Sequence, residues 1–152
     1  MNALKSEIRI NSINTNGSVG DGVGVRSVVF FQGCTMHCPG CHNATTWDPC
    51  GGKTMRVEEI VESLCAVPFR DVTISGGEPL LQPEGLLDLC QALHERNFDI
   101  ALYTGRQESD VPEAIWSCID WIKTGEFRQE LKTSTHPFVG SENQVFRRVI
   151  RK

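Results

Sequence analysis

The sequence has no long apolar segment and no excess of positive charge. Its longest uninterrupted apolar runs, such as Val28 to Phe31, have four residues, whereas a membrane-spanning helix needs about 20. The N-terminal residues 1–5 lack the apolar region of a signal peptide. A net charge of −4 gives no overall basic field that would attract nucleic acid. We therefore predict a cytoplasmic protein whose partners include neither a membrane nor a nucleic acid.

The sequence also has no internal repeat, low-complexity tract or recognisable domain linker. Its 152 residues suit one domain with a substantial core, so we predict a single domain over residues 1–152. Cysteine, in contrast, is abundant, with seven residues. An odd count leaves one cysteine outside any set of disulfides, and in a reducing cytosol clustered cysteines are more often metal ligands or catalytic residues.

Strand patterns and helical periodicities alternate along the chain. Helices are expected after a cap at Thr54, from about Pro83, and over roughly 111–118. Strands are expected over 7–13 (an edge strand followed by a loop over 14–24), 25–32, 71–75, 99–104, 121–124 and 144–150. Such alternation predicts parallel strands with right-handed crossovers. A closed eightfold barrel usually needs about 250 residues, so we predict an α/β fold that forms a partial, open (β/α) barrel.

Three cysteines follow the expected strand 25–32 directly, at C-x3-C-x2-C spacing: Cys34, Cys38 and Cys41. Three thiolates can hold three irons of a [4Fe–4S] cluster and leave the fourth iron open. An open position is what a metal site needs for chemistry, by analogy with catalytic zinc. The alternative is a structural zinc site in which His37 or His42 is the fourth ligand.

Two further turns follow expected strands, Ser75-Gly76-Gly77-Glu78-Pro79 after 71–75 and Tyr103-Thr104-Gly105 at the end of 99–104. Ligands of open α/β sheets bind at the carboxyl ends of the strands. We therefore expect both turns to converge with the cysteine loop on one small-molecule site.

These motifs resemble those of the radical S-adenosylmethionine enzymes, which combine C-x3-C-x2-C with a Gly-Gly-Glu-Pro turn. Within that superfamily the chain is most similar to the activating proteins of anaerobic ribonucleoside-triphosphate reductases. The resemblance covers roughly Asp21 to Gln144 and is carried by segments 30–34, 40–43, 46–47, 75–80, 103–105 and Gly140-Ser141-x-Asn143-Gln144.

The resemblance implies a mechanism and its cofactors. A reduced [4Fe–4S] cluster would cleave S-adenosylmethionine to methionine and a 5′-deoxyadenosyl radical, which would generate a glycyl radical on the reductase. The electron would come from a low-potential donor such as flavodoxin. The cofactor carries the hard chemistry, and the protein positions and shields it.

The resemblance also implies roles for individual residues. Cys34, Cys38 and Cys41 would ligate the cluster, with Cys41 beside the S-adenosylmethionine site. The remaining contacts to S-adenosylmethionine would come from Gly76, Gly77 and Glu78 at the methionine amino group, Gly40 and His42 at the adenine or ribose, and Tyr103 with Thr104 in the same pocket. The branch often has aspartate where this chain has Thr124, a departure that bears on the late strand and on docking of the partner.

Two other functions remain open at this point. One is a radical S-adenosylmethionine enzyme that acts on a small molecule, as the carboxy-deazaguanine synthases do. The other is a non-enzymatic, zinc-stabilised binding module. Among the remaining cysteines, Cys65 and Cys90 are expected to be small core residues. Cys50 as a fourth cluster ligand would block the binding of S-adenosylmethionine.

Overall fold

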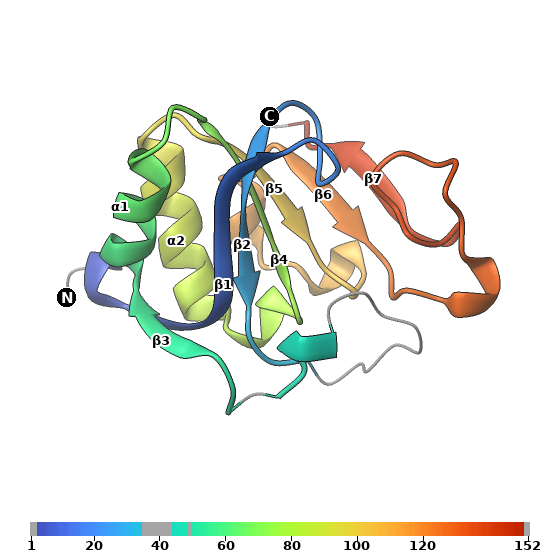
Figure 1. Ribbon diagram of the computed structural model, residues 1–152, viewed down its shortest axis with the longest axis horizontal. Helices are drawn as coiled ribbons and strands as arrows, with labels where there is room; N and C mark the ends of the chain where they lie inside the picture. The colour runs from blue at the N-terminus through green and yellow to red at the C-terminus, as the bar shows by residue number, and fades with distance from the viewer. Residues whose placement is uncertain (1–2, 35–43, 49, 151–152) are drawn as a thin grey trace.

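The computed structural model describes residues 3–34, 44–48 and 50–150. In this part of the chain seven strands form one sheet, in the order β3-β1-β2-β4-β5-β6-β7. Figure 1 shows the sheet twisted, with α1 and α2 packed together along one side of it. The strands β3 and β7 each have one neighbour, so the sheet is open rather than closed into a barrel.

Four neighbouring strands form the parallel core of the sheet. In that core Phe31 pairs with Gly76, and Ile74 pairs with Leu102. The parallel register brings the carboxyl ends of these strands to one edge, as the alternating sequence pattern predicts. Their bounds lie within one residue of the predicted ones: β2 (Arg26–Phe31), β4 (Asp71–Gly76), β5 (Asp99–Tyr103) and β6 (Trp121–Thr124).

Three antiparallel strands extend this core: β1 (Glu7–Ser18), β3 (Lys53–Arg56) and β7 (Val145–Arg148). The expectation of an edge strand over 7–13 is wrong, because β1 lies between β3 and β2. The strand also continues into the expected loop, where Ser18 pairs with Arg26. Thr54 does not cap a helix, because it pairs with Arg9 within β3.

The helices follow strands, as expected, but their ends differ from the predicted ones. The first α-helix begins at Val57, and the Glu59 carboxylate accepts a hydrogen bond from the Arg56 N–H at 2.9 Å. Their bounds are α1 (Val57–Cys65), α2 (Pro83–Glu95) and α3 (Glu113–Trp116). Short 3-10 helices occur at Ala3–Lys5, Ala44–Thr46, Pro79–Leu81, Glu108–Asp110 and Gln129–Leu131.

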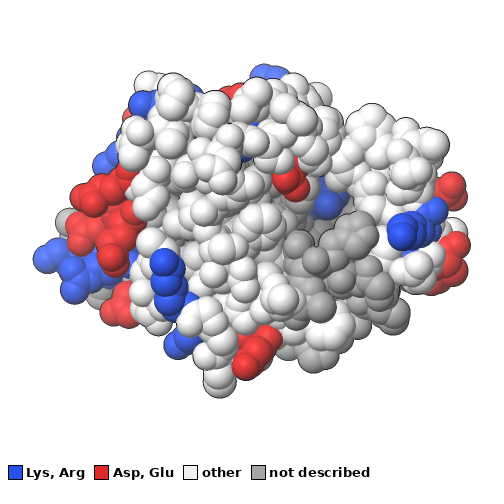
Figure 2. All heavy atoms as spheres, viewed as in Figure 1, with Lys and Arg blue, Asp and Glu red and all other residues white. Residues whose placement is uncertain are grey.

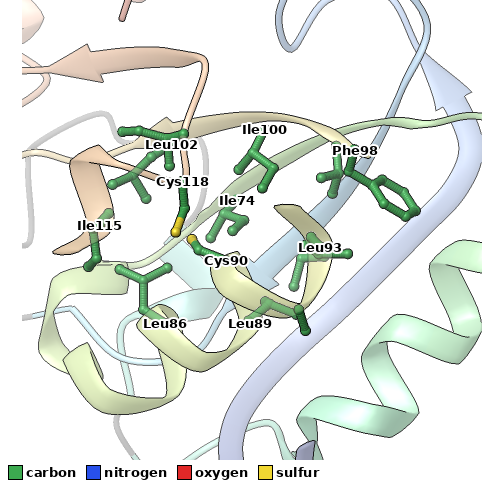
Figure 3. Close-up of a cluster of buried hydrophobic side chains, with 14 of the residues drawn as sticks. Ile74, Leu86, Leu89, Cys90, Leu93, Phe98, Ile100, Leu102, Ile115 and Cys118 are labelled. Atoms are coloured by element: carbon green, nitrogen blue, oxygen red, sulfur yellow. The ribbon is translucent and has the colours of Figure 1, made fainter. Parts of the chain in front are cut away.

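The hydrophobic core lies between the sheet and the helices. Figure 3 shows Cys90 of α2 and Cys118 with their sulfur atoms toward one another, among Ile74, Leu86 and Leu102. Burial raises the pKa of the Cys90 thiol, which therefore stays protonated and acts as a small apolar group. Cys90 is thus a core residue as predicted. The same prediction for Cys65 is wrong, because it lies exposed at the end of α1.

A buried arginine closes the amino end of the parallel strands. Arg26 is 1% exposed, and its guanidinium donates hydrogen bonds to the hydroxyl of Thr73 and to the carbonyl oxygens of Val23, Val72 and Asp99. It also pairs with the Asp99 carboxylate at 2.7 Å. A single side chain therefore joins β2, β4 and β5 at the end opposite the predicted site. Among the described residues, no helix is both long and apolar enough to cross a membrane.

Candidate cofactor-binding site

A cavity of about 430 Å³ lies at the carboxyl ends of the parallel strands. On the face shown in Figure 2 the surface is hollowed to the right of centre, and a basic side chain lies in the hollow. Six of the residues that the sequence assigned to S-adenosylmethionine or the cluster line this cavity: Cys34, Gly76, Gly77, Glu78, Tyr103 and Thr104. The predicted convergence of the three loops therefore holds for the described residues.

Backbone hydrogen bonds hold the two ends of the cysteine loop together. The Gly33 N–H donates to the carbonyl oxygen of Thr46 at 2.5 Å, and the Cys34 N–H donates to that of Trp47 at 3.0 Å. These bonds place Cys34 directly after β2, at the mouth of the cavity. The backbone position of Cys34 is therefore set by hydrogen bonds within the fold.

The turn after β4 is bonded to the same segment. The Gly77 N–H donates to the carbonyl oxygen of Phe31 at 3.0 Å, and the Glu78 N–H donates to that of Gly33 at 2.8 Å. Both contacts join the turn to the end of β2. The Gly-Gly-Glu turn and the first cysteine thus form one hydrogen-bonded unit at the carboxyl edge.

Two glycines are required in this turn by close backbone packing. A Cβ atom at Gly76 would lie 2.3 Å from the backbone nitrogen and oxygen of Phe31, and its φ of 119° also disfavours any side chain. A Cβ atom at Gly77 would lie 2.2 Å from the carbonyl oxygen of Gly33. Only glycine fits at both positions, which leaves backbone rather than side chain at this side of the cavity.

The Glu78 carboxylate is buried and receives three hydrogen-bond donors. Glu78 is 1% exposed, and its Oε2 accepts the Leu80 N–H at 2.9 Å. The Thr104 hydroxyl lies 2.8 and 2.9 Å from the two carboxylate oxygens, and the Gly105 N–H donates to Oε1 at 2.8 Å. A buried charge requires such partners. The carboxylate therefore links the turn after β4 to the turn after β5.

Tyr103 lines the cavity and carries a buried hydroxyl. Its side chain is 6% exposed, and its hydroxyl has no hydrogen-bond partner in the described part of the chain. Burial, with a smaller contribution from the charge of Asp21, raises the pKa of Tyr103, so the phenol stays protonated. The Lys123 ammonium lies 4.0 Å from the ring centroid. A buried phenol without a partner suits a bound polar ligand.

The opposite wall of the cavity is formed by the connection between β6 and β7. The Gln144 side chain accepts hydrogen bonds from the Gly140 and Ser141 N–H groups and donates to the carbonyl oxygen of Gly125 at 3.0 Å. Asn143 donates to the carbonyl oxygen of Glu126 at 2.8 Å. The Gly-Ser-x-Asn-Gln segment thus fastens one loop to the other. Both β6 and β7 form even though Thr124 stands where the resembling branch often has aspartate.

The structure also identifies cavity residues that the sequence did not assign to the site: Asp21, Lys123, Phe127, Phe138 and Gln144. Lys123 lies near the carboxyl end of β6, so the strand-end rule that found the other turns applies to it as well. Phe138 has a φ of 64°, which is uncommon for a bulky residue and has no signal in the sequence.

The remaining predicted residues, Gly40, Cys38, Cys41 and His42, lie outside the described residues. The two alternative zinc ligands, His37 and His42, also lie outside the described residues. Within residues 3–34, 44–48 and 50–150, no group of three or more His, Cys, Asp or Glu residues could hold a metal ion. Cys50 is exposed and does not line the cavity.

Comparison with protein families gives a match over residues 20–147 to the family described as "4Fe-4S single cluster domain". The match covers most of the chain, which therefore belongs to this family. The cysteine loop and all the described cavity residues fall within the matched range.

Two curated relatives are activating enzymes. The chain is 46% identical over 102 residues to the pyruvate formate-lyase-activating enzyme of Clostridium pasteurianum, a match covering 63% of this chain and 42% of that protein. It is 40% identical over 104 residues to the pyruvate formate-lyase 1-activating enzyme of Escherichia coli (strain K12), covering 63% and 41%. The chain thus spans about two fifths of the length of these relatives.

A solved structure with a similar fold is that of QueE from Escherichia coli. The TM-score is 0.52 at 21% sequence identity, and the match covers 65% of this chain and 52% of that chain. At this identity the likeness concerns the fold. Together with the open seven-stranded sheet it confirms the predicted α/β partial barrel of the radical S-adenosylmethionine type.

These findings support the predicted radical S-adenosylmethionine superfamily, and they confirm its two cofactors, a [4Fe–4S] cluster and S-adenosylmethionine. The described residues fit both groups. Cys34 presents a thiol, the ligand type of iron–sulfur clusters, to the cavity. The half-buried Gly76 and Gly77 line the same cavity, as does Tyr103 with its buried, unpartnered hydroxyl. The narrower resemblance, to the reductase-activating proteins, stays a prediction.

Proposed function

We propose that this chain is a glycyl-radical activating enzyme. The observation that supports this proposal most directly is that Cys34 and the Gly76–Glu78 turn line the same cavity, and that backbone hydrogen bonds join the turn to Phe31 and Gly33, just before Cys34. A thiolate for a cluster and a glycine turn for S-adenosylmethionine are thereby side by side. The similarity to two activating enzymes supports the same reaction class.

The proposed roles follow from the positions of the described residues and from the resemblance. Cys34, Cys38 and Cys41 hold the cluster. The backbone at Gly76 and Gly77, together with Glu78, receives the methionine amino group. Glycine is required at both positions because a Cβ atom would clash with the backbone of Phe31 or Gly33, and this close packing holds the turn beside the cysteine segment.

The other contacts belong to the nucleoside half of S-adenosylmethionine. Gly40 and His42 contact the adenine or ribose, and the Tyr103 hydroxyl donates or accepts a hydrogen bond in the same cavity. When bound between these residues, the cluster and S-adenosylmethionine would supply the one-electron chemistry needed to remove a hydrogen atom from a glycine of the partner. The protein holds both groups together and limits the access of water.

We propose an anaerobic ribonucleoside-triphosphate reductase as the partner, flavodoxin or a similar low-potential protein as the electron donor, and the cytoplasm as the location. The motif that separates this partner from others is Gly140-Ser141-x-Asn143-Gln144, whose amide side chains hold the far wall of the cavity. The activating-enzyme relatives are named for pyruvate formate-lyase instead. The test therefore includes both the anaerobic reductase and pyruvate formate-lyase.

The test uses protein reconstituted anaerobically with iron and sulfide, then reduced and mixed with S-adenosylmethionine. We expect 5′-deoxyadenosine by chromatography. With the reductase present we expect the doublet of a glycyl radical by electron paramagnetic resonance, and no doublet with pyruvate formate-lyase. Cys34→Ala removes both signals, whereas Cys65→Ala, at an exposed cysteine on α1, keeps both.

The outcomes separate the parts of the proposal. A doublet on pyruvate formate-lyase alone would replace the partner and leave the reaction class intact. Formation of 5′-deoxyadenosine with neither doublet would favour a small-molecule substrate. Bound zinc and no iron after anaerobic preparation would contradict the radical chemistry altogether.

A further inference from the structure

The turn after β4 and the turn after β5 lie beyond the last paired residues of their strands. The described ladder between β4 and β5 ends at the pair formed by Ile74 and Leu102. Past that pair, the Glu78 carboxylate reaches Thr104 and Gly105 of the neighbouring turn. The relative position of the two turns therefore depends on this carboxylate and its donors.

The three donors to Glu78 differ in kind. The N–H groups of Leu80 and Gly105 are backbone groups, which any residue except proline supplies. Thr104 donates through its side chain, so this contact alone among the three depends on the identity of the donor residue. Thr104 is 3% exposed, which keeps the contact away from bulk water.

The direction of the Thr104 hydroxyl proton is set by a further contact. The Arg106 N–H donates to the Thr104 oxygen at 3.1 Å. A hydroxyl has one proton to donate, and its oxygen can accept. With the oxygen accepting from Arg106, the proton is free to point at Glu78. The Thr104 hydroxyl thus links its own turn to the Glu78 carboxylate, because its oxygen accepts from Arg106 and its proton is donated to Glu78.

We propose that Thr104 is a positioning residue, which acts through Glu78 to hold the Gly76–Glu78 turn in the geometry that binds the methionine end of S-adenosylmethionine. The inference rests on the proposed function, since it concerns the same cavity. It adds a role for a residue that does not itself have to touch the ligand. A hydrogen bond to a charged group has the strength to make such positioning measurable.

The experiment measures the equilibrium affinity of the reconstituted, unreduced protein for S-adenosylmethionine by calorimetric titration, together with thermal unfolding. Thr104→Val keeps the shape and removes the hydroxyl, and we expect the Kd to rise about tenfold. Thr104→Ser restores the hydroxyl and is expected within about twofold of the original Kd. If Thr104→Val does not fold, Thr104→Ala replaces it, and the same rise in Kd is expected.

A matched control is available on the neighbouring part of β4. The Thr73 hydroxyl is buried, donates to the Asp21 carbonyl oxygen at 2.6 Å and accepts from Arg26 at 3.0 Å. Thr73→Val therefore also removes a buried hydroxyl with two partners. We expect it to lower the unfolding temperature without changing the Kd.

A double-mutant cycle tests whether Thr104 acts through Glu78. Glu78→Gln alone weakens binding, and adding Thr104→Val is expected to weaken it by much less than tenfold further, because the two residues act as a unit. Additive effects would overturn the inference. So would a Thr104→Val protein that unfolds earlier yet binds normally, or a Thr104→Ser protein as weak as the valine variant.

The same titration distinguishes failure of the proposed function from failure of the positioning role alone. If the unaltered, cluster-containing protein does not bind S-adenosylmethionine, both proposals fall together. If it binds and Thr104→Val binds equally well, only the positioning role falls.

Discussion

The two ends of the parallel strands are each closed by one buried charged residue. Arg26 at the amino end and Glu78 at the carboxyl end are both 1% exposed. Arg26 donates to groups on β4 and β5, whereas Glu78 accepts from the turn after β5 and from its own turn. Both satisfy the requirement that a buried charge be hydrogen-bonded.

The difference lies in what borders each residue. Arg26 does not line the cavity, and its partners are backbone carbonyl oxygens, a threonine hydroxyl and the carboxylate of Asp99. Glu78 lines the cavity, and the turns that it joins carry the predicted ligand contacts. A buried, hydrogen-bonded charge therefore stabilises the fold at one end and borders the candidate binding site at the other. Substitutions at the two ends test whether stability and binding are separated in this way.

The largest effect is expected from Gly77→Ala at the carboxyl end. The added Cβ would lie 2.2 Å from the Gly33 carbonyl oxygen and 2.9 Å from that of Thr46, so the turn must move. A displacement of about 1 Å can cost about 100-fold in rate, and we expect at least that loss in formation of 5′-deoxyadenosine. Gly20→Ala is the control, because Gly20 also lines the cavity but a Cβ there has no neighbour within 4 Å. Equal activity of both variants would refute the steric argument.

At the amino end, Arg26→Met is expected to lower the free energy of unfolding by about 3–5 kcal/mol, because it leaves Asp99 and several carbonyl oxygens without their donor. Urea unfolding of the cluster-free protein measures the loss. Affinity for S-adenosylmethionine should stay within about twofold in the folded, reconstituted variant. A larger loss of affinity would show that the two ends are not independent.

A smaller effect on stability is expected from Cys90→Ala. Truncation of this fully buried side chain should cost about 1–2 kcal/mol, in the range of small core truncations. The iron content after reconstitution should not change. Cys34→Ala should show the opposite behaviour, with loss of iron and little change in the unfolding of the cluster-free protein. Loss of iron from the Cys90 variant would contradict the assignment of this residue to the core.

The smallest effect on stability is expected from the ion pair between Glu108 and Arg147, which closes neither end of the parallel strands. The hydrogen bond from Arg147, at 2.6–2.7 Å, lowers the pKa of Glu108. A carboxyl with a lowered pKa in the folded state stabilises the protein above its unfolded pKa, and this stabilisation is lost as the pH falls through the folded value. The two side chains are 41% and 39% exposed, so solvent screening limits the effect to less than about 1 kcal/mol.

Thermal unfolding of Glu108→Gln beside the original protein tests this prediction. The difference between the two proteins should be present at pH 7, shrink in high salt, and disappear at pH values below the lowered pKa. A difference that grows as the pH falls would contradict the ion-pair explanation.

The sequence predicted the parallel core and the meeting of its loops because both depend on local rules. Apolar strand patterns located β2, β4, β5 and β6, and parallel strands bring their carboxyl ends together. Cys34 and the Gly76–Glu78 turn therefore converge as expected. The strand β3 was missed because its four residues are mostly polar and exposed, and it exists through pairing with β1.

The contacts that shape the site depend on tertiary register and were not predictable. The bond between Glu78 and Thr104 joins residues 26 positions apart. Gln144 was recognised as part of a motif, but its hydrogen bond to Gly125 becomes visible only when β6 and β7 pair. Phe138 has a φ of 64°, and its ring centroid lies 5.0 Å from that of Phe146; neither feature has a local signature in the sequence.

The hydrogen bonds that join Gly33 to Thr46 and Cys34 to Trp47 have a consequence for metal uptake. Residues 33–34 and 46–47, which border the segment containing Cys38 and Cys41 in the sequence, are thereby held together by the fold. Closing a loop costs chain entropy that rises with the logarithm of its length, and here folding has already supplied that closure. If Cys34, Cys38 and Cys41 hold the cluster, as we propose, folding lowers the entropic cost of bringing them to the metal, as the ring of a macrocyclic chelator does. The folded protein should capture iron at lower concentrations than a linear peptide with the same residues.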